Sequence, residues 1–121
     1  MNTIKIFQGS QCSGKTTTAQ KLIEKNGADK SVYLDTDNVH DDWEMSDDIT
    51  LLCLDGICGV MELLKVLNII IPYLSKRTVP IDFILIAQTK IEHFNADIPN
   101  TTVQLISFPL SDDDHNLLLN N

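Results

Sequence analysis

The sequence carries the run GSQCSGKT at residues 9–16, which fits the pattern G-x-x-x-x-G-K-[ST] at every fixed position. Each residue type in this pattern has a physical task. The two glycines allow the backbone to fold around phosphate oxygens with its N–H groups pointing inward. Lys15 would reach the β- and γ-phosphates of a nucleotide, and the Thr16 hydroxyl would help to hold Mg²⁺. The run therefore predicts a site for a nucleoside triphosphate, formed by Gly9, Ser10, Gln11, Cys12, Ser13, Gly14, Lys15, Thr16 and Thr17.

The segments on either side of this run have the character that such a site needs. Residues 4–8 alternate in polarity like a strand, and residues 17–25 have the pattern of a helix that ends near Asn26 and Gly27. A strand, a glycine-rich loop and a helix in this order would place the partial positive charge of the helix N-terminus at the bound phosphates.

The rest of the chain supplies further alternating elements. Apolar runs predict strands at 31–35, 49–55, 81–87 and 102–108, and residues 60–76 suit a helix that Pro72 would kink or shorten. The acidic triplet 112–114 has the composition of a solvated loop. Continuous apolar strands that alternate with helices indicate an α/β domain with a mostly parallel sheet covered on both faces. We expect one domain over residues 1–121.

Polar side chains end several of these predicted strands, where ligands of open α/β sheets lie. Asp55 ends the strand at 49–55 and is a candidate to hold the Mg²⁺ shell together with Thr16. Asp37, or less favourably Asp35, could orient or deprotonate an attacking water. Gln88 could contact the γ-phosphate. The predicted catalytic residues are therefore Lys15, Asp37 and Gln88.

Together with segments 33–37, 51–55 and 84–90, the run at 9–16 resembles the RecA-like and FtsK/HerA-like division of P-loop NTPases. The resemblance covers most of the chain and implies a five-stranded sheet of order 5-1-4-3-2. It also implies a Mg²⁺-dependent ATPase that works on DNA in packaging, transfer or recombination. The loop after Gln88, residues 89–100, would contact DNA, and the chain would form a homo-oligomeric ring.

The sequence departs from that group in its catalytic carboxylate. Members commonly carry a Glu directly after the strand-ending Asp or at the end of the second strand, whereas here Gly56 follows Asp55 and the second strand offers Asp37. Slow hydrolysis, or binding without turnover, is therefore a second expectation. Arg77 is the only arginine of the chain, so it is either a finger that reaches a neighbouring subunit or a solvated cation at a helix end.

Three other functions fit parts of the sequence. The D-x-D at 35–37 is similar to that of small-molecule kinases, although such kinases need several arginines and this chain has one. Residues 89–92 faintly resemble the guanine-reading N/T-K-x-D of GTPases, but Cys58 stands where the D-x-x-G pattern requires glycine. A nucleotide-binding switch or assembly subunit without turnover is the third.

Composition and charge limit the partners and the cellular compartment that we expect for the protein. The net charge of −8 argues against a broad electrostatic grip on nucleic acid, without excluding contact through one loop. The longest uncharged apolar stretch, residues 66–75, is too short to span a bilayer, so we expect no membrane span. The three cysteines lack the spacing of a metal site, which predicts a reduced, cytoplasmic compartment.

Overall fold

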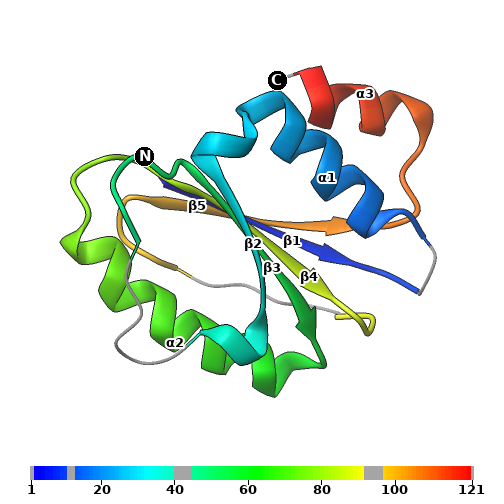
Figure 1. Ribbon diagram of the computed structural model, residues 1–121. Helices are drawn as coiled ribbons and strands as arrows, with labels where there is room; N and C mark the ends of the chain where they lie inside the picture. Colours follow the sequence, from blue (N-terminus) through cyan, green and yellow to red (C-terminus); the bar gives the residue numbers. More distant parts are fainter. Residues whose placement is uncertain (1, 11–12, 40–44, 92–96, 121) are drawn as a thin grey trace.

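Five strands form one wholly parallel sheet in the computed structural model, which describes residues 2–10, 13–39, 45–91 and 97–120 (Figure 1). The strands are β1 (Asn2–Gln8), β2 (Ser31–Asp35), β3 (Leu51–Ile57), β4 (Asp82–Ala87) and β5 (Thr101–Ser107). The helices are α1 (Lys15–Asn26), α2 (Val60–Lys76) and α3 (Asp112–Asn120), with short 3₁₀ turns η1 (Ala28–Lys30) and η2 (Thr36–Asn38). The sheet order β2-β3-β4-β1-β5 confirms the expected 5-1-4-3-2 arrangement and the α/β class.

Helices cover the sheet on both faces, with α1 and α3 on one side and α2 on the other (Figure 1). The two faces follow from the period of two along each strand. Ile4 and Ile6 of β1 belong to the cluster beneath α2, whereas Phe7 belongs to the cluster beneath α1. Strands β1 and β4 are central and need apolar residues on both faces, which is why Phe83–Ala87 reads as an uninterrupted apolar run.

Parallel pairing brings the C-terminal ends of the strands to one edge of the sheet. Strand β1 pairs with β4 and β5, so the loop that follows Gln8 lies between the ends of these two neighbours. Strand β2 pairs with β3 in a register that sets Asp35 beside Asp55. Register partners point to the same face of a sheet, and both carboxylates therefore lie on the α1 side.

Helix α2 has the expected bounds, and Pro72 does not shorten it. The structure corrects two expectations about other elements. Strand β3 continues through Gly56 to Ile57, with a register irregularity at this point in its pairing with β4. Residues 112–114 form the first turn of α3 rather than a loop. Their carboxylates complement the positive end of the helix dipole, and Ser111 Oγ accepts a hydrogen bond from the Asp114 amide at 3.2 Å.

Across the described ranges, no helix combines the length and the apolar character that crossing a membrane requires.

Candidate functional site

The first glycine of the loop is required by a close approach between backbones. Gly9 follows β1 with a φ of +147°, and a Cβ placed on it would lie 2.5 Å from the carbonyl oxygen of Phe108. The Phe108 amide in turn donates to the Gln8 carbonyl at 2.8 Å, so the end of β5 is held directly against the start of the loop. Only glycine allows the loop to leave β1 at this point.

The second glycine has a different task. Gly14 has φ +96° and ψ 8°, in the left-handed region, and precedes the first turn of α1. Its carbonyl accepts the Thr18 amide at 3.0 Å and so starts the helix. A Cβ on Gly14 would meet nothing within 4 Å, so here glycine serves the backbone conformation and leaves open space before the helix. Gln11 and Cys12, also predicted to bind phosphate, lie outside the described residues.

The Lys15 side chain folds back into the loop that precedes it. Its Nζ donates to the Gly9 carbonyl at 2.6 Å and to the Ser10 carbonyl at 2.9 Å, and only 6% of the residue is exposed. The Ser13 hydroxyl donates to the same Ser10 carbonyl at 2.6 Å. A buried ammonium at the N-terminus of a helix is an unusual arrangement, because the helix dipole disfavours a cation there. An anion at this position would relieve that conflict.

The Asp55 carboxylate is held by neighbours on both of its oxygens. Oδ1 accepts hydrogen bonds from the Gly56 amide and from Gln88 Nε2, each at 2.7 Å. Oδ2 accepts a hydrogen bond from the Tyr33 hydroxyl. The irregular end of β3 makes this possible, because the Gln88 amide bonds to the Ile57 carbonyl at 2.7 Å and so draws the end of β4 beside Asp55. The structure thus brings Asp55 and Gln88 together.

Tyr33 connects this carboxylate to the glycine loop. Burial and the hydrogen bond to Asp55 raise the pKa of the Tyr33 hydroxyl, and a side-chain hydrogen bond with Thr16 acts in the opposite direction. The phenol oxygen is therefore hydrogen-bonded to Asp55, one of the two residues that were predicted to hold Mg²⁺. Sequence reasoning missed Tyr33. The period of two places it on the same face as Asp35, but the cross-strand register that brings it to Asp55 cannot be read from the chain alone.

Cys53 lies on the same face of β3 as Asp55, two residues earlier. Burial, and secondarily the Asp55 charge, raise the pKa of the Cys53 thiol to about 12. The side chain is completely buried and belongs to the cluster beneath α1. Cys53 is therefore a neutral core residue that forms the floor below the candidate site.

The carboxylate that ends β2, Asp35, and the one that follows in η2, Asp37, lie in different surroundings. Asp35 is the register partner of Asp55 and is exposed on the α1 face. Asp37, predicted to position water, lies in η2 and lines a groove of about 600 Å³ together with the α2 residues Glu62 and Lys65. The structure thus places Asp35, rather than Asp37, beside the Asp55 cluster.

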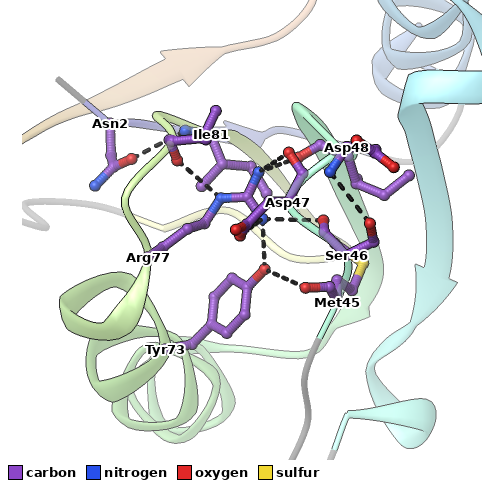
Figure 2. A network of polar contacts seen from close by, with 10 residues as sticks. Asn2, Met45, Ser46, Asp47, Asp48, Tyr73, Arg77 and Ile81 are labelled. Atoms are coloured by element: carbon purple, nitrogen blue, oxygen red, sulfur yellow. Dashed lines mark hydrogen bonds and ion pairs between the residues drawn. The ribbon is translucent and has the colours of Figure 1, made fainter.

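Arg77 is neither a finger nor a solvated cation. Its side chain is only 1% exposed, and its guanidinium makes five hydrogen bonds. Figure 2 shows it beneath the segment that precedes β3, with acceptors that include the carbonyls of Ser46 and Asp47 and the hydroxyl of Tyr73. The exposed carboxylate of Asp47 lies 3.7 Å away. A side chain sequestered in this way cannot reach a neighbouring subunit.

Gln8 ties the loop to the segment that follows β4. Its buried amide oxygen accepts a hydrogen bond from the Ile91 amide at 3.1 Å, and its Nε2 donates to the Ser107 hydroxyl. The residue directly before Gly9 therefore contacts the first part of the segment that the resemblance assigns to DNA. Residues 92–96 of that segment lie outside the described residues.

Comparison with protein-family models, with curated proteins and with solved structures finds no match for this chain in any of the three. Among the described residues, no group of three or more His, Cys, Asp or Glu side chains could hold a metal ion by itself. The oxygen atoms that the described residues offer in this region include the Asp55 carboxylate and the Thr16 hydroxyl. These are hard oxygen ligands of the kind that Mg²⁺ uses when substrate phosphates and water complete its coordination.

Proposed function

We propose that this protein binds ATP with Mg²⁺ at residues 9–17 and hydrolyses it slowly. The observation that carries the proposal is the Lys15 ammonium, which lies buried inside a loop of the G-x-x-x-x-G-K-[ST] pattern at the N-terminus of α1. A buried cation that donates to the Gly9 and Ser10 carbonyls in this place is poised to exchange them for the more strongly charged oxygens of a phosphate. The all-parallel sheet of order 2-3-4-1-5 supports the same proposal.

Each residue near the loop has a role in this proposal. The loop N–H groups and the α1 dipole would hold the phosphates, while Lys15 would turn from the Gly9 and Ser10 carbonyls toward the β- and γ-phosphates. Thr16 and Asp55 would hold Mg²⁺, which when bound neutralises charge on the phosphates. Gln88 lies against Asp55 and could respond to the γ-phosphate through it.

Asp35 is the carboxylate best placed to orient the attacking water. It stands beside Asp55 in the parallel register and is open to solvent, whereas Asp37 lines the groove at α2. Asp is one methylene shorter than Glu, and Asp35 ends β2, an edge strand that is separated from β1 by both β3 and β4. Both facts favour slow turnover over fast turnover.

A second candidate, binding without hydrolysis, is favoured by one specific observation. Gly56 occupies the position after Asp55 where an adjacent catalytic carboxylate would stand, and its amide is bonded to Asp55 instead. The kinase alternative is disfavoured, because the single arginine of the chain is buried in internal hydrogen bonds and cannot clamp a transferring phosphate. The DNA-related process and the homo-oligomeric ring stay predictions that rest on the resemblance.

The test measures ATP binding by titration calorimetry in the presence of Mg²⁺, with Lys15→Met compared against Lys21→Met. Lys21 is an exposed lysine of the same helix, so both variants remove the same charge from α1. We expect Lys15→Met to weaken binding about tenfold or more and Lys21→Met to change it by less than about twofold. Equal affinities in the two variants would refute the site. Phosphate release by the wild type that Lys15→Met lacks would establish turnover and exclude binding without hydrolysis.

A further inference from the structure

Tyr33 stands out among the residues around the loop because no role in the proposed function uses it. Its hydroxyl donates a hydrogen bond to Oδ2 of Asp55. Asp55 is one of the two residues to which the proposed function assigns Mg²⁺. The hydroxyl therefore occupies an oxygen that is intended as a ligand of the ion.

The two oxygens of Asp55 differ in how firmly they are held. Oδ1 is fixed by the Gly56 amide, which is part of the irregular end of β3, and by the Gln88 amide group. Oδ2 accepts a hydrogen bond from the Tyr33 hydroxyl, which comes from a side chain exposed on the neighbouring strand. Release of Tyr33 would thus free one oxygen for the ion without disturbing the contacts that orient the carboxylate.

Tyr33 can leave at small cost to the packing of the molecule. The residue lies on β2, the outermost strand, and it is 40% exposed, whereas Tyr73 is 8% exposed. It is absent from both hydrophobic clusters that hold the sheet to the helices. Rotation of its side chain toward solvent would therefore release Asp55 Oδ2 without exposing the core.

We propose that Tyr33 is a latch that closes the Mg²⁺ position of the ligand-free protein and is displaced when Mg²⁺ and nucleotide bind together. The proposal rests on the proposed function and adds a positioning residue to the same site. The latch competes with the ion for Asp55 Oδ2. It has no such competition with nucleotide alone, so its effect on affinity must depend on Mg²⁺.

The first test measures the affinity of the non-hydrolysable ATP analogue AMP-PNP for the wild type, Tyr33→Phe and Tyr73→Phe, with Mg²⁺ and with EDTA. Phenylalanine keeps the ring and removes the competing hydroxyl. We expect Tyr33→Phe to bind the Mg²⁺ complex about fivefold more tightly than the wild type and to match it in EDTA. Tyr73→Phe makes the same chemical change at the opposite end of the sheet, in the Arg77 network, and is expected to match the wild type in both conditions. Equal or weaker binding of the Mg²⁺ complex by Tyr33→Phe would overturn the latch.

The second test follows the latch directly. The chain has two tyrosines, so protein labelled with ¹³C at the phenol carbon of tyrosine gives two resonances, which Tyr33→Phe assigns. We expect Mg²⁺ with AMP-PNP to shift the Tyr33 resonance and leave that of Tyr73 in place. Binding that depends on Lys15 but leaves the Tyr33 resonance unmoved would overturn the latch alone. Absence of any binding to the wild type would overturn the proposed function and the latch with it.

Discussion

The Nε2 atom of Gln88 donates a hydrogen bond of 2.7 Å to Oδ1 of Asp55, which joins the ends of two neighbouring strands through their side chains. This contact makes the carboxylate, rather than the amide, the centre of the polar cluster. Asp55 also accepts from the Gly56 amide and from the Tyr33 hydroxyl. Changes at Asp55 and at Gln88 should therefore have separable effects on the site.

Replacement of Asp55 by Asn should remove the Mg²⁺ dependence of ATP binding. The variant loses the anionic oxygen that would hold the ion, so its affinity for ATP with Mg²⁺ should fall about tenfold, to the value measured in EDTA. Gln88→Ala is the control, because it removes a partner of Asp55 and leaves the carboxylate; it should keep most of the Mg²⁺ dependence. Titration calorimetry with and without EDTA measures both. An Asp55→Asn protein with wild-type affinity would exclude Asp55 from the site.

Replacement of the two loop glycines by Ala should reduce folding stability by different amounts. Gly9→Ala would set a methyl group 2.5 Å from the Phe108 carbonyl oxygen and should cost about 3 kcal/mol of folding stability. Gly14→Ala meets no atom within 4 Å and should cost only about 1 kcal/mol, from its positive φ. Urea unfolding measures both. A Gly14→Ala protein destabilised as strongly as Gly9→Ala would contradict this reading of the loop.

The described part of the fold was largely predictable from the sequence, and the reason is physical. Buried parallel strands are long apolar runs whatever their neighbours, so the runs at 49–55 and 81–87 correspond to β3 and β4. The helix at 112–120 was missed because its acidic first turn resembles a solvated loop. Ser111, three residues before Asp114 and six residues before the three leucines at 117–119, is the capping signal that could have revealed it.

Most residues of the candidate site could be predicted from the sequence, but the contacts between them could not. The motif at 9–16 predicts the loop. The ends of the predicted strands indicate the edge of the sheet at which Asp55 and Gln88 lie. The contact between Tyr33 and Asp55 depends on which residue of β2 faces which residue of β3, a register that no local pattern encodes. The burial of the Arg77 guanidinium likewise depends on hydrogen bonds to carbonyls about 30 positions away along the chain. Long-range pairing of this kind is what single-sequence reasoning lacks.

Arg77 should contribute to folding stability and not to the nucleotide site. Arg77→Met removes five hydrogen bonds, four to carbonyls of residues 46–49 and 79 and one to the Tyr73 hydroxyl, and should cost about 3 kcal/mol of the free energy of unfolding. Asp47→Asn is the matched change at its ion-pair partner. Because Asp47 is 65% exposed, this substitution should cost no more than about 0.5 kcal/mol. Urea unfolding compares the two, and equal losses would show that the ion pair, rather than the carbonyl contacts, carries the stability.

Raised pH should destabilise the protein through Cys53. Burial raises the pKa of this thiol from 9.0 to about 12, so between these values the unfolded chain loses the proton while the folded protein keeps it. The stabilisation is complete below pH 9 and is lost as the pH rises toward 12. At pH 10 the loss attributable to Cys53 should reach about 1.4 kcal/mol. Cys53→Ala has no thiol to ionise, so the difference in unfolding free energy between wild type and variant should shrink from pH 8 to pH 10 by this amount. A difference that stays constant over that range would show that the folded thiol ionises like an exposed one.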